Sequence, residues 1–341
     1  MSTIVDVCKL AGVSKATVSR VINGTGQVKK STQETVHAAM EQLGFRPNSL
    51  AQALAAKQTN SIGLVVSDFQ GDYFGTLLKQ ASTSAEGANK ELIVTNGHND
   101  ALREYEAIQL LADRKCDAIV LYSRKMTMEQ LQKLKQQLSV PLVLINRELS
   151  EPLFHSVTFD QRSPVNLMMN HLIAYGHRKI ACITGPIETP TTQARLTAYK
   201  EVLQQHAIRF NEHLVKNVKY GLQDGYDACQ ELIKSNLPFS ALFAFNDEMA
   251  LGALKALTDA GIRVPEQVSI AGIDNIPMTK FSHPTISTID LPIEEVTKHA
   301  VEIALKLAAG EQCAFLNQYK GKLLQRDSVL PYHSHKNWLT C

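Results

Sequence analysis

The chain has 341 residues, 44% of them hydrophobic, and a formal net charge of +2 at pH 7. This length predicts two or three domains with a sizeable core. No run of about 18 apolar residues occurs, and Asp6 and Lys9 interrupt the N-terminus where a signal peptide needs an apolar core. We therefore expect a cytoplasmic protein that does not enter a membrane. The six cysteines are scattered without a Cys-x-x-Cys pair, which disfavours a metal site and a disulfide framework.

Residues 4–24 predict two short amphipathic helices on either side of a tight turn. Gly12 gives the backbone freedom that the turn needs, and Ser14 is placed to N-cap the second helix. Apolar spacing turns Val18 toward a core, and this pattern is typical of a helix-turn-helix, although other small three-helix bundles share it. The residues expected to contact DNA lie on and beside the second helix: Ser14, Lys15, Ala16, Thr17, Ser19, Arg20 and Asn23.

Two further helices are predicted before residue 60. The run Ser31-Thr32-Gln33-Glu34 reads as a capping box, with Ser31 as N-cap of a third helix that ends near Gly44. Residues 46–57 then form an Ala-rich segment too short to be a stable helix alone, so it needs a partner. Residues 1–60 carry seven Lys or Arg against three Asp or Glu, whereas the rest of the chain carries 28 against 30. A basic head on a slightly acidic body suits contacts with DNA phosphates.

From residue 61 onward, short β-branched runs alternate with helical stretches. This rhythm predicts parallel sheets with right-handed crossovers, in two similar α/β lobes. The strands are expected at residues 62–66, 91–94, 118–121, 141–145, 179–183, 241–245 and 268–273. No nucleotide-binding glycine motif, no Gly-x-Ser-x-Gly and no His-Glu-x-x-His occurs, so we expect neither an enzyme nor a bound cofactor.

Ligands of open parallel sheets meet the loops at the carboxyl ends of the strands. Polar and aromatic residues stand at such positions, and we expect them to bind a ligand: Tyr73, Phe74, Asn146, Arg147, Asp160, Arg195, Tyr220, Asn246 and Asp274. Carboxylates, amides and a guanidinium hydrogen-bond paired hydroxyls, and rings stack on a pyranose, so a neutral sugar fits.

Three of these assignments have structural alternatives. Arg195 could pair with Asp274 merely to hold the lobes together, Tyr220 could belong to the core, and Asp247 is expected to be a helix N-cap. A purine is the rival ligand, but it would favour aromatic sandwiches and fewer carboxylates than Asp160 and Asp274 provide.

Several motifs resemble those of the LacI/GalR family of bacterial transcription regulators, closest to the galactose repressor and cryptic β-glucoside repressor branch. They are Ala11-Gly12-Val13-Ser14, Thr17-Val18-Ser19-Arg20-Val21, Arg46-Pro47-Asn48 and Ala51-Gln52-Ala53-Leu54-Ala55. The resemblance implies a periplasmic-binding-protein type I body, in which residues matching Arg195, Asn246 and Asp274 bind the effector. It also implies a hinge helix that pairs with its twin and wedges Leu54 into the minor groove. Asn48 and Lys57 join the expected DNA contacts. Many relatives have proline where Asp72 precedes the aromatic pair here, so the resemblance is weakest there.

The resemblance also implies the domain boundaries: a DNA-binding head at 1–46, a hinge at 47–60 and an effector-binding and dimerisation domain at 61–341. Lobe one would take residues 61–160 and 292–320, and lobe two residues 163–289 and 325–341. The expected function is a homodimeric repressor of a sugar-utilisation operon, released from a palindromic operator by a galactoside or β-glucoside. The alternatives are a purine-responsive or co-repressor type, or a sugar-binding protein whose basic head binds DNA nonspecifically.

Overall fold

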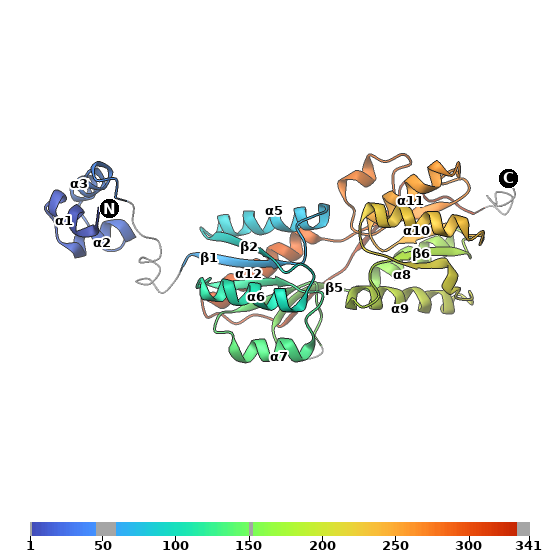
Figure 1. Cartoon of the computed structure of the whole chain (residues 1–341), viewed down its shortest axis with the longest axis horizontal. Coiled ribbons are helices and arrows are strands. Elements are labelled where there is room, and N and C mark those ends of the chain that lie inside the picture. The colour runs from blue at the N-terminus through green and yellow to red at the C-terminus, as the bar shows by residue number, and fades with distance from the viewer. Residues whose placement is uncertain (1, 46–58, 150–152, 333–341) are drawn as a thin grey trace.

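The structure is a computed structural model that describes residues 2–45, 59–149 and 153–332. A three-helix head precedes a body of two α/β lobes (Figure 1). The predicted hinge contacts Asn48, Leu54 and Lys57 lie outside the described residues. No helix of the described part of the chain is long and apolar enough to cross a membrane.

The head is a bundle around a small apolar core. Its three helices are α1 (Ile4–Ala11), α2 (Lys15–Asn23) and α3 (Lys30–Gln42). Val7, Val18 and Val36, one from each helix, are fully buried against one another. This packing confirms the predicted inward position of Val18.

One helix start in the head matches its prediction and one does not. Ser14 caps α2, because its hydroxyl accepts a hydrogen bond from the N–H of Thr17 at 3.2 Å. The predicted cap at Ser31 is wrong, since α3 begins at Lys30 and Ser31 already lies in its first turn. The Gln33 amide reaches back to the carbonyl of Val28 at 3.2 Å instead of closing a capping box.

Lobe one is built on a six-stranded sheet in which every strand pair is parallel, with the order β11-β5-β4-β3-β1-β2. Its strands are β1 (Ser61–Val66), β2 (Glu91–Asn96), β3 (Ala118–Tyr122), β4 (Leu142–Ile145), β5 (His155–Phe159) and β11 (Leu316–Tyr319). Alternate residues of β3 enter two different apolar clusters, one on each face of the sheet. The helices that cover these faces are α5 (Asp72–Gly87) with α12 (Ile293–Ala308), and α6 (Ala101–Asp113) with α7 (Met128–Gln137).

Lobe two repeats this plan on a four-stranded parallel sheet with the order β7-β6-β8-β9. The strands are β6 (Ile180–Thr184), β7 (Val215–Asn217), β8 (Ala241–Ala244) and β9 (Ser269–Ala271). Figure 1 shows α10 and α11 along one side of this sheet and α8 and α9 along the other. These helices are α8 (Ser163–Ala174), α9 (Pro190–Gln205), α10 (Leu222–Lys234) and α11 (Asp247–Asp259).

Three segments of the chain connect the two lobes. The first, residues 160–162, joins β5 to α8, and the second, residues 291–292, joins β10 (Thr288–Asp290) to α12. The third, residues 320–321, joins β11 to β12 (Lys322–Leu324), which pairs with β10 in an antiparallel ribbon. Each lobe is therefore assembled from segments that lie far apart in the sequence.

A side chain at Gly252 should destabilise lobe two. A Cβ on Gly252 of α11 would overlap the carbonyl oxygen of Leu222, and one on Gly225 of α10 would overlap the backbone of Met249. The two helices cannot separate without disturbing packed cores, so Gly252→Ala should cost about 1–3 kcal/mol of unfolding free energy. Thermal unfolding monitored by circular dichroism measures this loss of stability.

The matched control is Gly75→Ala in α5. A Cβ at Gly75 meets nothing within 4 Å, so alanine there should stabilise the helix by up to about 1 kcal/mol. Equal melting temperatures for the two variants would show that α10 and α11 do not depend on their close approach.

Candidate functional site

The outward surface of α2 carries several exposed side chains. Lys15, Ala16, Arg20 and Asn23 are exposed, whereas Thr17 and Ser19 are half-buried. The Asn23 amide donates a hydrogen bond to the Ser19 hydroxyl at 3.3 Å, which holds both side chains on this surface. The α2 helix thus presents the predicted set of polar side chains together on one element.

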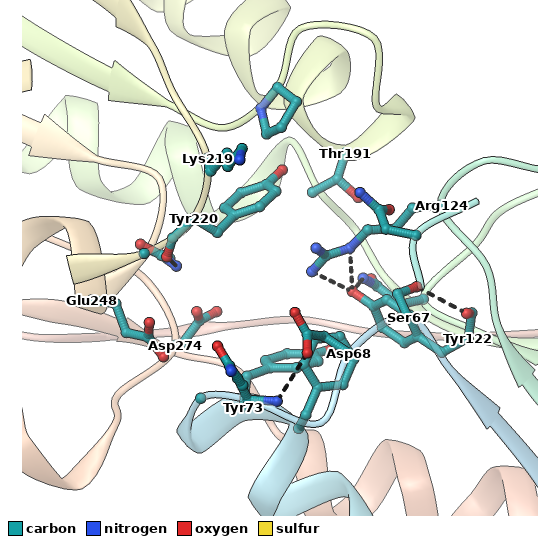
Figure 2. Close-up of a pocket in the computed structure, with 18 of the residues that line it drawn as sticks. Ser67, Asp68, Tyr73, Tyr122, Arg124, Thr191, Lys219, Tyr220, Glu248 and Asp274 are labelled. Carbon is teal, nitrogen blue, oxygen red and sulfur yellow. Dashed lines mark hydrogen bonds between the residues drawn. The ribbon is translucent and has the colours of Figure 1, made fainter. Parts of the chain in front are cut away.

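A cavity of about 330 Å³ lies between the two lobes, at the carboxyl ends of strands from both sheets (Figure 2). This volume falls at the lower end of the usual range of roughly 300–1,000 Å³ for ligand pockets. Seven of the nine predicted ligand contacts line it: Tyr73, Phe74, Asn146, Arg195, Tyr220, Asn246 and Asp274. We call this cavity the cleft.

The structure does not bring Arg147 and Asp160 to the cleft. Arg147 points the opposite way from its neighbour Asn146 and donates to the Ser123 hydroxyl at 3.3 Å, beside the buried Glu104. Asp160 accepts hydrogen bonds from the N–H groups of Arg162 at 3.0 Å and Ser163 at 3.3 Å, and so fixes the turn before α8. Both side chains therefore make hydrogen bonds within the protein outside the cleft.

Asp274 is the most strained residue of the cleft. Its φ is 116°, a conformation that side-chain-bearing residues seldom adopt and that tends to occur at functional sites. Burial raises the pKa of its carboxyl group to about 8, which the neighbouring Arg195 partly offsets. Its side chain makes no hydrogen bond within the described residues, so its oxygens are available to a ligand.

The predicted N-cap of α11 is wrong by one residue. Asn246 is the cap, with its side-chain oxygen accepting from the N–H of Met249 at 2.9 Å. Asp247 is fully buried and accepts from the Thr288 hydroxyl at 2.6 Å and the N–H of Ile276 at 3.0 Å. It therefore ties α11 to the segment that leads out of lobe two.

A chain of side-chain hydrogen bonds crosses the floor of the cleft from one lobe to the other. The Asn146 amide donates to the Tyr122 hydroxyl at 2.8 Å, and its oxygen accepts from Gln161 at 2.5 Å. Gln161 lies in the first connecting segment, and its oxygen accepts from Nε of Arg195 at 3.0 Å. Arg195 in turn donates to the carbonyl of Phe245. The orientation of Arg195 is therefore set from both lobes.

Arg124 follows β3 and enters the cleft among aromatic rings. Its guanidinium carbon lies 4.7 Å from the ring centroid of Tyr220 in lobe two, and 5.2 Å and 5.5 Å from those of Tyr122 and Phe74 in lobe one. The buried Glu104 positions this loop, since it accepts from the Ser123 hydroxyl at 2.5 Å and from the N–H of Arg124 at 3.4 Å.

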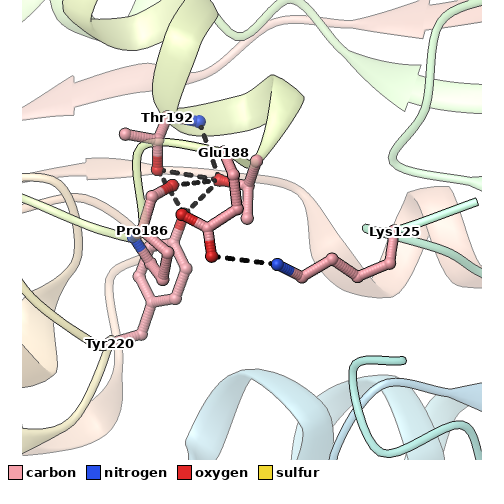
Figure 3. A network of polar contacts seen from close by, with 6 residues as sticks. Lys125, Pro186, Glu188, Thr192 and Tyr220 are labelled. Atoms are coloured by element: carbon pink, nitrogen blue, oxygen red, sulfur yellow. Dashed lines mark hydrogen bonds and ion pairs between the residues drawn. The ribbon is translucent and has the colours of Figure 1, made fainter. Parts of the chain in front are cut away.

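An ion pair joins the lobes at the rim of the cleft. Lys125 and Glu188 lie 3.0 Å apart, and Figure 3 shows them reaching toward each other from opposite lobes. The loop that carries Glu188 is organised around Tyr220, whose hydroxyl lies 2.8 Å from that of Thr192 and 3.3 Å from that of Thr189. The ring of Tyr220 therefore lines the cleft, and its hydroxyl contacts the loop that carries the ion pair at the rim.

A second contact between the lobes involves Glu248 at the start of α11. A hydrogen bond from the backbone of Asp72 reaches its carboxylate, and a Cβ on Gly71 would lie 2.5 Å from Glu248 Oε1. Burial and the nearby Asp72 carboxylate raise the pKa of Glu248. Gly71, with φ of 86°, allows this close approach.

Sequence reasoning missed Arg124, Gln161 and Glu248. Arg124 follows a predicted strand, so the rule that found Asn146 could have found it as well. Gln161 and Glu248 gave no such signal, because their partners lie tens of residues away in the sequence or in the other lobe.

A DNA-reading head joined to a two-lobed body with a cleft defines the class of ligand-responsive transcription regulators. The comparisons identify the family. The model of the bacterial regulatory proteins of the lacI family matches residues 3–48, and that of the periplasmic binding protein-like domain matches residues 169–329. The chain belongs to the LacI family and is a transcription regulator rather than an enzyme.

Three relatives and one solved structure support this identification. The chain is similar to the HTH-type transcriptional regulator AscG of Escherichia coli, with 39% identity over 97% of this chain and 99% of that protein. It is 34% identical to the regulator GalR of Escherichia coli, over 96% of each chain. It is also 32% identical to the repressor PurR of Haemophilus influenzae, over 90% of this chain and 91% of that one. A crystal structure of the lac repressor dimer, bound to operator and the anti-inducer ONPF, superposes with a TM-score of 0.88 at 25% identity, covering 96% and 99% of the two chains.

Proposed function

We propose that this protein is a sugar-responsive transcriptional repressor, and that its effector is of the galactoside or β-glucoside type. The observation that carries the proposal is the strained carboxyl group of Asp274, which has no hydrogen-bond partner among the described residues and lies in a cleft with Arg195 and Asn246. A carboxylate, a guanidinium and an amide together can accept and donate the paired hydrogen bonds of neighbouring hydroxyls. Relatives named AscG and GalR, at 39% and 34% identity, support a regulator of this kind.

The mechanism is a two-state linkage between the cleft and the head. The effector closes the lobes, and closure lowers the affinity of the protein for its operator. Operator must then weaken effector binding by the same factor by which the effector weakens operator binding. The lac repressor binds its operator as a dimer. Two copies of this chain would place their α2 helices in successive major grooves.

A purine is the second candidate effector, because PurR is 32% identical to the chain. Purine bases fit best between parallel aromatic faces. The rings of lobe one instead meet edge to face, at 81° between Tyr73 and Phe74 and 78° between Phe74 and Tyr122. This arrangement offers ring edges and single faces to the cleft, which favours a sugar.

Fluorescence anisotropy of the full chain on a labelled family-type palindrome with a central CG step tests the proposal. D-galactose, the β-glucosides arbutin and salicin, and hypoxanthine are added in turn. Release by galactose or a β-glucoside is the expected result. Release of the operator by hypoxanthine alone would show that the effector is a purine. Tighter operator binding in the presence of a sugar would show that this sugar is a co-repressor. Weak binding that depends only on salt would overturn the repressor itself.

The ion pair at the rim should contribute to effector affinity. In Glu188→Gln, Lys125 loses its partner, and the closed lobes lose an exposed ion pair worth about 0.2–1 kcal/mol. We expect the affinity for the releasing sugar to fall by up to about fivefold in 50 mM NaCl, and by less in 500 mM NaCl because salt screens exposed charges. Isothermal titration calorimetry measures this. Glu129→Gln, which breaks the exposed pair with Lys133 on α7, is the control and should change nothing. An equal loss of sugar affinity in both variants would show that the ion pair between Lys125 and Glu188 does not contribute to closure of the lobes.

A further inference from the structure

Arg124 places a cation in the cleft, and most of its hydrogen-bond donors have no partner among the described residues. A guanidinium has five N–H donors. Nε and Nη2 of Arg124 both donate to the Tyr122 hydroxyl, at 3.3 Å and 3.1 Å. Among the residues that the structure describes, no carboxylate pairs with this guanidinium and no other acceptor bonds it. Its Nη1 is thus free for a ligand.

The other arginines near the cleft, Arg195 and Arg326, each donate to more than one acceptor of the protein. Arg195 donates to Gln161 and to the carbonyl of Phe245, and it is the cation that acts most strongly on Asp274. Arg326 donates to Asn275 and Thr279. Arg195 also lies beside Asp274, whereas Arg124 donates to the Tyr122 hydroxyl alone among the described residues.

The rings around Arg124 stabilise its charge without using those donors. Cation–π contacts form over ring faces and contribute about 0.5–2 kcal/mol, but an N–H in the plane of the guanidinium still needs an acceptor. A phosphate or carboxylate can accept two parallel N–H bonds from a guanidinium edge. The cage formed by Phe74, Tyr122 and Tyr220 therefore holds Arg124 in place for an anionic group.

The cleft is lined by cations and carboxyl groups together: Arg124, Arg195, Lys219, Asp68, Asp224, Glu248 and Asp274. Figure 2 shows Arg124 toward one side of the cavity, and Glu248 and Asp274 toward the other. A ligand with hydroxyls at one end and an anion at the other would match both sides. A neutral sugar would leave the charge of Arg124 without a counter-ion.

We infer that the effector is an anionic glycoside, a sugar with a phosphate or carboxylate substituent that Arg124 binds. The sugar hydroxyls contact Asp274 and Arg195, and the anionic substituent accepts hydrogen bonds from Arg124. This inference rests on the proposed function, because it assigns a chemical class to the ligand of the same cleft. It adds a specificity determinant that no predicted ligand contact supplied.

Binding of matched sugars to the full-length protein tests the inference. Isothermal titration calorimetry compares glucose with glucose 6-phosphate and glucuronate, galactose with galactose 6-phosphate and galacturonate, and arbutin with its 6-phosphate. Inorganic phosphate alone is the reference for a free anion. We expect one charged member to bind at least about tenfold more tightly than its neutral counterpart, and to release the labelled operator.

Variants locate the charge preference at Arg124. In Arg124→Gln the ratio between charged and neutral affinities should fall to about threefold or less, and Arg124→Lys should give an intermediate ratio because lysine keeps the charge but not the paired donors. Arg103→Gln removes the same charge from the exposed surface of α6 and should leave the ratio as in the unaltered protein. Melting curves verify that each variant is folded.

The outcomes distinguish this inference from the proposed function. If neutral sugars release the operator and charged ones bind no better, the anionic class is wrong while the sugar-responsive repressor stands. A charge preference that survives in Arg124→Gln would also overturn the role of Arg124. Inorganic phosphate binding as tightly as the sugar phosphates would reduce the site to a free-anion site. If no sugar of either kind binds or releases operator, both proposals fail.

Discussion

Asp274→Asn should make the free protein more heat-stable near pH 8 and at the same time insensitive to its effector. The Asp274 carboxyl group is desolvated in the cleft and makes no side-chain hydrogen bond there, so its charge opposes folding. Asparagine removes the charge and keeps the shape. Above about pH 8, where the Asp274 carboxyl group is ionised, the effector loses a charge-assisted hydrogen bond worth about 1.5–3 kcal/mol, so its affinity should fall roughly 10- to 150-fold.

The pH dependence of this stabilisation has a definite sign. The folded protein holds a proton on Asp274 up to about pH 8, whereas the unfolded chain releases it near 3.8. Between these values the folded state binds more protons, so this group lowers stability as the pH rises. The difference in melting temperature between Asp274→Asn and the unaltered protein should therefore be small at pH 4, grow up to about pH 8 and then level off.

Asp259→Asn is the control for the pH series. Asp259 is a surface carboxylate of α11 whose pKa is lowered by its hydrogen bond to Lys255, so this variant should show no stabilisation that grows with pH. Scanning calorimetry from pH 4 to 9 measures the melting temperatures. A constant offset for Asp274→Asn across that range would mean that the gain comes from relieved backbone strain rather than from the buried charge.

Arg20→Ala should remove sequence discrimination, whereas Lys29→Ala should weaken binding to every DNA sequence alike. Arg20 is exposed on α2, where a guanidinium can form two hydrogen bonds with a guanine, and losing such a contact costs about 1–3 kcal/mol per half-site. Lys29 is exposed just before α3 and would meet a phosphate. A phosphate contact carries no sequence information.

Salt titrations on two operators separate these roles. One operator keeps the guanine that Arg20 reads, and the other replaces it in both half-sites. Arg20→Ala should bind both operators equally, while Lys29→Ala should keep the preference and reduce the slope of log affinity against log salt by about one per contact. If Arg20→Ala still prefers the first operator, another residue of α2 reads that base.

Local patterns predicted the elements that pack against near neighbours in the sequence. Strands β1 to β4 each carry an apolar run, and all four were expected within two residues of their observed bounds. Strand β5 was missed because His155 and Ser156 interrupt its apolar pattern, and β11 because its register is set by pairing with β5, about 160 residues earlier. Such strands depend on tertiary contacts rather than on local propensity.

In the candidate site, sequence patterns likewise could not predict the direction of single side chains where the folded loop sets it. The rule that ligands meet strand ends placed Asn146 and Asp274 correctly in the cleft, but it could not tell Asn146 from Arg147. Asn146 has a left-handed backbone with φ of 58°, which sends the next side chain away toward Glu104. That turn is a property of the folded loop and leaves no trace in hydrophobic spacing.

The order in which the lobes are completed bears on how the chain folds as it is synthesised. The sheet of lobe one lacks its edge strand until residues 316–319 have emerged from the ribosome, and lobe two lacks the hydrogen bonds that Ser328 makes with Ile270 until later still. Strand β5 therefore presents an open edge for most of translation, and open edges invite pairing with other chains. A message truncated before Leu316 would yield a product that aggregates instead of a shortened regulator.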